Sequence, residues 1–322
     1  MIKLNLSRAK GFTTHRSGWK YCIDSLLPFH SRGGIFVDDF VERAFCWKLR
    51  SYYEKNNEYK IPYKFPWIGF VHNPPNVPEW FDYYNSTEAL FKRPVFLESL
   101  KTCRCLITLS TYLKKWIESK TDVPVISIKH PTETPPTTWN LRKFLSDPNP
   151  RLIQIGYWLR KMDSIANINA PRHYKRFWLP SNIEYASEMT NVHKKTLHEL
   201  EGRRYRWSRA EKIDRVSNDL YDDWMSSGVV FLDLYDSSAN NAIIESISRN
   251  TPILVNKIKP VVEYLGKDYP LYFENLDQAA QLLSDKENIY NAHVYLKDMD
   301  KEWIQGSFFA AKLTKKLKEI IL

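Results

Sequence analysis

The chain of 322 residues has few cysteines and few glycines, and it lacks any long apolar run. Its four cysteines do not make a disulfide framework, so we expect reduced thiols and a cytoplasmic protein. Ten glycines against 18 prolines exclude a collagen-like repeat. No apolar stretch is long enough for a spanning helix, and residues 1–18 lack the apolar segment of a secretory signal. We therefore expect neither a membrane span nor a secretory leader.

Several ligand-binding motifs are also missing. Cys103 and Cys105 form a Cys-x-Cys pair without a second pair at ligand spacing, so we expect two structural thiols and no metal site. A Walker A motif and a G-x-G-x-x-G motif are absent, which excludes the usual glycine-rich nucleotide loops. There is no zinc-finger or RNP pattern and no block of five basic residues, so only the overall charge favours nucleic-acid binding.

That charge is +10, and most of it lies in the first half of the chain. Residues 1–150 hold 22 Lys and Arg against 14 Asp and Glu, a net charge of +8. A basic surface attracts nucleic acid, anionic lipid or a phosphorylated substrate, although a plainly solvated basic face explains it equally well. The charge therefore leaves open a peripheral contact between the first half and an anionic membrane.

The pattern of apolar runs predicts two α/β domains. Short buried strands are expected in both halves, each followed by a turn and a helical pattern, which is typical of a parallel sheet covered by helices. The expected strands are 66–71, 105–109, 124–128, 151–155, 229–234 and 252–255, and expected helices follow Ser110 and cover 276–283 and 303–322. With 43% hydrophobic residues and many aromatics, the chain can build two cores.

The clearest break in composition is 131–150, where five prolines disfavour regular structure and indicate an inter-domain linker. We place the N-terminal domain at 1–140 and the C-terminal domain at 141–302. Residues 303–322 form a basic amphipathic helix that we expect to pack on the protein, with the N-terminal domain as a candidate surface. Residues 170–215 are highly charged and weakly periodic, and we expect a helix and a surface loop there.

The segment after the strand at 229–234 carries the strongest chemical signal. Asp236, Ser237 and Ser238 are residue types that cap helices, and a helical pattern follows them. On that helix Glu245 lies opposite the face of Ile243 and Ile247, so we expect its carboxylate to point away from the core and into the cleft. One carboxylate can accept hydrogen bonds from both hydroxyls of a ribose. The alternative is an ordinary solvated glutamate.

Residues 238–255, with 262–266, resemble the donor-binding segment of glycosyltransferases of the B fold (GT-B). The nearest group is the large retaining family that uses nucleotide-activated sugars. The resemblance implies two Rossmann-like domains that face each other across a cleft, with the donor on the second and the acceptor on the first. That family carries two glutamates with seven residues between them. The second falls on Glu245 and implies a ribose contact, whereas the first falls on Ser237, so half of the motif is missing or shifted to Asp236.

A second resemblance follows the strand at 151–155. In the family, a glycine turn followed by Arg and Lys binds the donor pyrophosphate, and Gly156, Arg160 and Lys161 are similar to it. Two cations at a strand end would neutralise the charge that grows on a leaving nucleoside diphosphate. In the first half, Gly18 resembles the glycine of the family's N-terminal loop, and His72 resembles a histidine that contacts the donor sugar.

The resemblance thus implies a metal-independent glycosyltransferase that uses a nucleotide-sugar donor and a glycan, lipid-linked or other hydroxyl acceptor, without a cofactor. The implied catalytic residues are His72, Arg160 and Lys161. The implied donor-binding residues are Gly18, Gly156, Arg160, Lys161, Ser238, Asn240, Asn241 and Glu245. A catalytically silent nucleotide-sugar or glycan-binding module is the main alternative, because Ser237 stands where the family has glutamate. The sequence does not select the sugar, the base, the acceptor or the stereochemical outcome.

Overall fold

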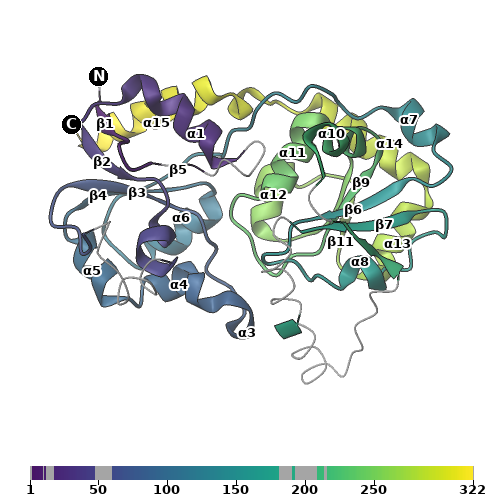
Figure 1. The fold of residues 1–322 in the computed structure, drawn as a ribbon, viewed down its shortest axis with the longest axis horizontal. Coiled ribbons are helices and arrows are strands. Elements are labelled where there is room, and N and C mark those ends of the chain that lie inside the picture. Colours follow the sequence, from purple (N-terminus) through teal and green to yellow (C-terminus); the bar gives the residue numbers. More distant parts are fainter. Residues whose placement is uncertain are drawn as a thin grey trace.

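The computed structural model describes residues 2–9, 11, 18–47, 60–180, 191–192, 209–213 and 216–321. Two parallel sheets lie in two lobes that stand side by side (Figure 1). The first sheet has the strand order β1-β2-β3-β4-β5. Its strands are β1 (Leu4–Asn5), β2 (Ile35–Asp38), β3 (Trp67–Val71), β4 (Cys103–Thr108) and β5 (Val125–Ser127).

The second sheet has the order β11-β10-β9-β6-β7-β8, and all its pairings are parallel as well. Its strands are β6 (Arg151–Ile155), β7 (Lys175–Leu179), β8 (Glu211–Lys212), β9 (Val229–Leu232), β10 (Ile253–Asn256) and β11 (Tyr272–Phe273). Every residue of β3, β9 and β10 is buried. Helices cover both faces of such sheets, which is why these strands appear in the sequence as continuous apolar runs.

Helices connect the strands of both sheets. The first lobe contains α1 (Trp19–Leu26), α3 (Glu79–Asp82), α4 (Thr87–Leu90), α5 (Pro94–Leu100) and α6 (Thr111–Glu118). The second contains α7 (Leu141–Ser146), α8 (Ser164–Asn167), α10 (Asn218–Ser227), α11 (Asn241–Arg249), α12 (Lys259–Leu265), α13 (Leu276–Ser284) and α14 (Lys286–Asp298). Short helical segments η1 (Leu27–Phe29), η2 (Arg43–Trp47), η3 (Tyr83–Asn85) and η5 (Glu302–Ile304) complete the described elements, together with α15 (Gly306–Ile321). The predicted α/β class with two Rossmann-like domains is confirmed.

The terminal helix α15 crosses back to the first lobe. In Figure 1 it lies beside α1, although the two helices come from opposite ends of the sequence. Its buried residues Phe309, Leu313 and Leu317 belong to the same apolar cluster as Leu4 and Ile23. Within the described residues the chain crosses between the lobes twice, once before β6 and once before α15. No helix in the described part of the chain is both long and apolar enough to cross a membrane.

Two sequence predictions need correction. Within 131–150 the structure forms the helix α7, because Leu141–Ser146 lies between the prolines and packs through Phe144 on the core of the second lobe. Within 170–215, where we expected a helix and a loop, β7 and β8 are strands of the second sheet. The side chains of Phe177, Trp178 and Leu179 in β7 are buried, and such a run of large apolar residues is typical of a central strand. Most of 181–208 lies outside the described residues.

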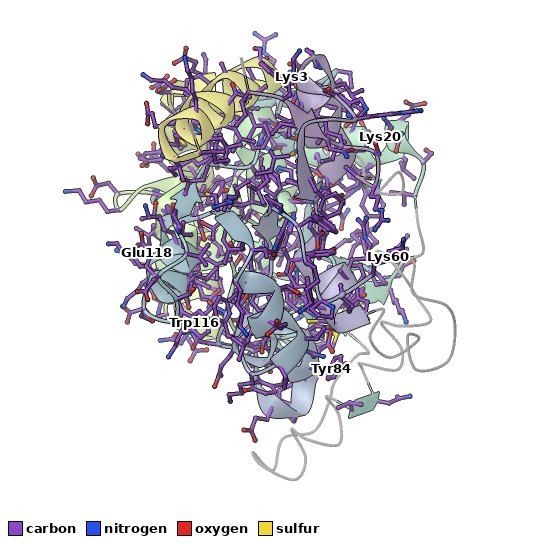
Figure 2. All side chains as sticks on the ribbon, turned by 90° about the vertical axis from the view of Figure 1, so that its left-hand side faces the viewer. Lys3, Lys20, Lys60, Tyr84, Trp116 and Glu118 are labelled. Carbon is purple, nitrogen blue, oxygen red and sulfur yellow. The ribbon has the colours of Figure 1, made fainter. Side chains whose placement is uncertain are left out.

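Basic side chains are spread over the surface of the first lobe. Figure 2 looks onto that end of the molecule, with Lys3 at the top, Lys20 and Lys60 on the right, and Trp116 and Glu118 on the left. Lys20 is paired with Asp24, at 2.5 Å.

Candidate functional site

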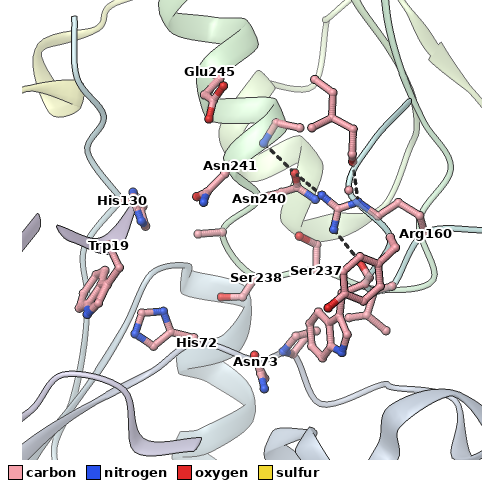
Figure 3. Close-up of a pocket in the computed structure, with 18 of the residues that line it drawn as sticks. Trp19, His72, Asn73, His130, Arg160, Ser237, Ser238, Asn240, Asn241 and Glu245 are labelled. Atoms are coloured by element: carbon pink, nitrogen blue, oxygen red, sulfur yellow. Dashed lines mark hydrogen bonds between the residues drawn. The ribbon is translucent and has the colours of Figure 1, made fainter. Parts of the chain in front are cut away.

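A cavity of about 660 Å³ lies between the two lobes. It opens at the carboxyl ends of the strands, where parallel α/β sheets bind ligands. The wall from the first lobe includes Trp19, Phe40, Trp47, His72, Asn73, Pro74, Asp82, Asn85, Leu109 and His130. The wall from the second includes residues 155–160, Leu179, Pro180, Val216, Asn218, Tyr221, residues 236–242 and Glu245. Figure 3 shows Trp19, His72 and His130 on one side and Arg160 on the other.

His72 follows β3 directly and is packed between aromatic rings. Phe40 stacks on its imidazole with the ring centroids 3.9 Å apart, and Trp19 meets it edge-on at 4.4 Å. Its Nε2 atom lies 3.0 Å from the backbone carbonyl oxygen of Asp39. A carbonyl only accepts, so Nε2 carries the proton of the neutral ring and Nδ1 is an acceptor. Burial lowers the pKa of His72 to about 3, which keeps the ring neutral at physiological pH.

The second wall begins with a tight loop after β6. Gly156 has φ +79° and Leu159 has φ +57°, both in the left-handed region. A Cβ at Gly156 would lie 3.2 Å from the guanidinium carbon of Arg160, so a side chain at 156 would press on that group as well as strain the backbone. The loop is tied to the strand end after β9, because the Lys161 amide donates to the Asp233 carbonyl oxygen at 2.7 Å.

The guanidinium of Arg160 faces the cavity and is held by three neutral oxygens. Nε donates to the Ile155 carbonyl oxygen at 3.1 Å, Nη1 to that of Trp158 at 2.6 Å, and Nη2 to Oδ1 of Asn240 at 3.3 Å. No carboxylate pairs with it among the described residues. Burial lowers the pKa of Arg160 to about 10, so the group stays charged near neutrality. Two of its five N–H groups are left to bind an anion.

Lys161 lies differently from its neighbour. Its Nζ atom is 2.9 Å from Oδ1 of Asp233, whose side chain is buried, and Lys161 is not one of the cavity-lining residues. Asp233 also accepts from the hydroxyl of Ser164 at 2.8 Å. The structure thus separates the two cations that are adjacent in the sequence. Arg160 lines the cavity, whereas Lys161 is paired with Asp233 and does not line it.

The helix α11 begins at the cavity, next to Arg160. Its cap is Asn240, whose Oδ1 accepts from the Ala242 amide at 3.1 Å as well as from Arg160. Asp236, Ser237 and Ser238 are therefore not the capping residues, contrary to the expectation from the sequence. Ser237, Ser238 and Asn241 line the cavity at the start of this helix (Figure 3). A helix N-terminus favours negative charge, so α11 and Arg160 reinforce each other at the same spot.

Glu245 lines the cavity, but its carboxylate is not solvated. Its side chain is only 9% exposed, and its Oε2 accepts from the hydroxyl of Tyr221 at 2.6 Å and lies 3.7 Å from Nη1 of Arg249. Arg249 is held in turn by Asp222 at 3.1 Å. The expectation of a carboxylate that points away from the core is corrected, because α10 packs on that face of α11 and supplies Tyr221 and Asp222.

Direct hydrogen bonds hold the lobes together around the cavity. Oδ2 of Asp236 accepts from the Asn76 amide and from the hydroxyl of Tyr112, each at 3.0 Å. Glu263 accepts from the amides of Thr111 and Tyr112, which begin α6. A carboxylate at that end of a helix satisfies free N–H groups and matches the helix dipole.

Gly18 is the remaining residue of the predicted set. It precedes α1 with φ −80° and is not one of the cavity-lining residues, although the next residue, Trp19, is. The N-terminal loop at 12–17 lies outside the described residues. Tyr221 was not predicted as a site residue, and Asp236 was named only as the place to which the family's first glutamate could have shifted; the fold supplies the contacts of both.

Metal ligands do not gather in the described part of the chain: no three His, Cys, Asp or Glu side chains there could hold an ion. The sequence contains one Asp-x-Asp, formed by Asp298 and Asp300. It lies at the end of α14, and neither residue is one of those that line the cavity.

Comparison with solved structures found similar folds at low identity. The Anabaena protein HepE, crystallised with UDP-glucose, is 10% identical with a TM-score of 0.61, over 88% of this chain and 78% of HepE. The trehalose-6-phosphate synthase OtsA is 11% identical with a TM-score of 0.57, over 94% of this chain and 76% of OtsA. The α,α-trehalose-phosphate synthase (UDP-forming) of Burkholderia vietnamiensis is 14% identical with a TM-score of 0.53, over 88% and 72%.

Neither a scan with protein-family models nor a search of curated proteins found a match to the sequence. At these identities the structural likeness establishes the fold. The two parallel sheets, the cavity between the lobes and the terminal helix that returns to the first lobe agree with it. The chain has the fold of the GT-B glycosyltransferases.

Proposed function

We propose that this protein transfers a sugar from a nucleotide-sugar donor to a hydroxyl acceptor. The donor diphosphate binds Arg160 and the start of α11, its nucleoside extends toward Glu245, and its sugar extends toward His72. The acceptor enters from the wall of the first lobe. No divalent cation is needed, because the guanidinium and the helix N-terminus supply the positive charge.

The observation that carries the proposal is the environment of Arg160. Its three bonded partners are neutral oxygens, and it stands at a cavity beside a helix N-terminus. Arg160 is partly buried, and a cation withdrawn from water without an opposite charge is costly, so a bound anion would reduce that cost. Arginine forms strong bonds with phosphate through its planar N–H groups, and here two of them are left for the ligand.

These positions suit the bond changes of sugar transfer. The bond between the anomeric carbon and the diphosphate oxygen breaks, and its electron pair leaves with the diphosphate. Arg160 and the start of α11 stabilise that charge as it grows, which is the interaction that lowers the barrier. The acceptor oxygen then bonds to the anomeric carbon, and its proton passes to the departing diphosphate oxygen. His72, neutral and with Nδ1 as an acceptor, suits a hydrogen bond from a sugar hydroxyl better than the role of a general base.

The comparisons suggest the first donors to test. HepE was crystallised with UDP and with UDP-glucose, and the synthase of Burkholderia vietnamiensis is described as UDP-forming. We therefore propose uridine diphosphate sugars as the donor class, with UDP-glucose as the first probe.

One observation favours the alternative of a silent binding module. Ser237 stands at the cavity where the resembling family has glutamate, and Asp236 beside it is bonded to Asn76 and Tyr112. A silent module would bind UDP-glucose without turnover.

The deciding experiment is incubation of the full chain with UDP-glucose in the absence of acceptor. Transferases of this kind release UDP slowly by transfer to water, and wild type should do so while the Arg160→Met variant should not. Binding of UDP-glucose without any UDP release would establish the silent module. If calorimetry detects no binding of UDP-glucose or of any nucleotide sugar in a wider panel, both the transferase and the silent module are rejected.

A further inference from the structure

An acidic segment lies beside His72 because two neighbouring strands end together. The strands β2 and β3 are parallel neighbours, with Asp38 opposite Gly69. Residues 39–43 follow the end of β2, and His72 follows the end of β3. The carboxyl ends of parallel strands meet at one edge of a sheet, so this segment and His72 are brought together at the cavity.

Glu42 makes the most specific contact in this segment. Its side chain is fully buried, and its Oε1 accepts from the backbone amides of His72 at 2.8 Å and Asn73 at 2.7 Å. One oxygen thus fixes two successive peptide groups at the point where β3 ends. The other oxygen, Oε2, is buried and has no hydrogen-bond partner among the described residues. Burial raises the pKa of Glu42 to about 7 in spite of the two amides.

The backbone of β3 is built to admit this contact. A Cβ at Gly69 would lie 2.7 Å from a methyl carbon of Val41 and 2.5 Å from the ring of Trp67. Only glycine lets the turn that carries Val41 and Glu42 approach the strand so closely. The approach brings the Glu42 carboxylate within hydrogen-bond distance of the strand end.

The same segment also fixes the imidazole. The carbonyl oxygen of Asp39 accepts from Nε2, and the ring of Phe40 stacks on the imidazole at an interplanar angle of 10°. Asp39 is itself held by Trp19, whose Nε1 donates to its carboxylate at 3.0 Å, and by Arg43 at 3.4 Å. Backbone and ring of His72 are therefore both held by residues 39–42.

We infer that Glu42 is a positioning residue for His72: it fixes the peptide groups at the end of β3 so that Nδ1 of His72 is held toward the donor sugar. The inference rests on the proposed role of His72 in sugar transfer. A buried carboxylate costs free energy, and a water molecule or hydroxyl could satisfy two amides at a cavity edge. The carboxylate instead defines one orientation of both peptides, which is the requirement for a group that must meet a substrate within a fraction of an ångström.

The test compares Glu42→Ala, Glu42→Asp and Glu42→Gln with His72→Ala and with the double variant Glu42→Ala/His72→Ala. Glu42→Gln keeps an oxygen at the position of Oε1. Glu42→Asp keeps a carboxyl group, but its side chain is one methylene shorter and the group no longer reaches the two amides. Asp38→Asn is the matched control, because Asp38 is a buried carboxylate next to this segment that accepts from the Tyr63 hydroxyl and the Phe40 amide and makes no hydrogen bond to His72, and asparagine keeps an oxygen for the Phe40 amide. The readouts are UDP release from UDP-glucose and the affinity for UDP.

We expect Glu42→Ala and Glu42→Asp to lower kcat by about tenfold or more, since small displacements of a substrate-binding group are costly. Glu42→Gln and Asp38→Asn should stay within about threefold of wild type, and the UDP affinity of all variants should change less than about twofold. In the His72→Ala background, Glu42→Ala should have no further effect. Equal, additive losses in both backgrounds, or a parallel loss of UDP affinity, would overturn the positioning role.

Histidine-selective nitrogen-15 labelling separates this inference from the proposed function. In wild type the side-chain resonances of His72 should show the Nε2–H tautomer, and its amide should exchange slowly. Glu42→Asp should increase the exchange of that amide whether or not the protein turns over UDP-glucose. An inactive wild type would refute the proposed function. An unchanged His72 amide in both Glu42→Asp and Glu42→Ala would refute the positioning role alone.

Discussion

Replacement of Arg160 by Met tests the diphosphate site directly. Methionine keeps an unbranched side chain of similar reach but removes the charge and the two N–H groups that the bonds to Ile155, Trp158 and Asn240 leave over. A hydrogen bond to a charged group contributes about 1.5–3 kcal/mol, so the loss of even one bond to the diphosphate weakens binding by about 10- to 150-fold. Loss of both bonds would weaken binding further, up to the point where UDP retains only its nucleoside contacts.

The assay compares UDP with uridine by calorimetry, in wild type and in Arg160→Met. This ratio is needed because the variant also loses the bonds from Arg160 to Ile155, Trp158 and Asn240. A distorted loop would weaken both ligands, whereas loss of the phosphate contact weakens UDP alone. Wild type should prefer UDP strongly, and the variant should lose most of that preference. An unchanged ratio of the two affinities would refute the assignment of Arg160 to the diphosphate.

Further predictions concern the other groups at the cavity. Glu245→Gln should weaken UDP binding about tenfold and remove most of the preference for ribose over 2′-deoxyribose, because charge-assisted hydrogen bonds become neutral ones. Tyr221→Phe removes a hydroxyl that already bonds Glu245, so UDP should bind more tightly by about two- to tenfold; weaker binding would show that Tyr221 contacts the nucleotide itself. Lys161→Met should change UDP affinity far less than Arg160→Met, yet lower the free energy of unfolding in urea by about 1–3 kcal/mol, because buried Asp233 loses its cation. Turnover of UDP-glucose should persist in excess chelator, and a complete loss that magnesium restores would contradict the metal-independent proposal.

The sequence predicted six of the described strands, β3, β4, β5, β6, β9 and β10, and missed β1, β2 and β11 as well as β7 and β8. The runs at β3, β9 and β10 are short and buried at every residue, and turn residues follow each of them, so the apolar pattern and the turn residues both indicate strands. The charged stretch around β7 lacks this pattern, and its strand was not predicted. Its strand begins with Lys175 and Arg176, and the buried part is only three residues long. Burial by neighbouring strands, which a local pattern does not contain, decided the outcome there.

The candidate site was predicted where a motif lies in one segment and missed where it is built from several. Gly156, Arg160 and Glu245 were found from spacing and resemblance, and all three line the cavity. Lys161 was included because it is adjacent to Arg160. In a tight loop with Leu159 at positive φ, adjacent side chains need not point the same way, and the amide of Lys161 is tied to Asp233. Its ammonium group therefore forms an ion pair with the carboxylate of the same residue, Asp233.

Glu42 shows the opposite case, a residue with no local signal. It is one of several acidic residues in a short basic and aromatic stretch, and its partners lie 30 and 31 positions further along the chain. Only the parallel pairing of β2 and β3 brings them together. The sequence feature that hints at it is Gly69 in the middle of an apolar strand, since a glycine there often marks a close approach of another segment, here through the side chain of Val41.

Asp236 accounts for the incomplete half of the family motif. The glutamate position is taken by Ser237, and the carboxylate next to it accepts from the Asn76 amide and the Tyr112 hydroxyl, both in the first lobe. Burial between the lobes raises the pKa of Asp236. An acid that joins the two lobes is not available to the donor sugar at the same time. In this chain the acidic group that precedes α11 therefore joins the two lobes, and Ser237 and Asn241 line the cavity beside it.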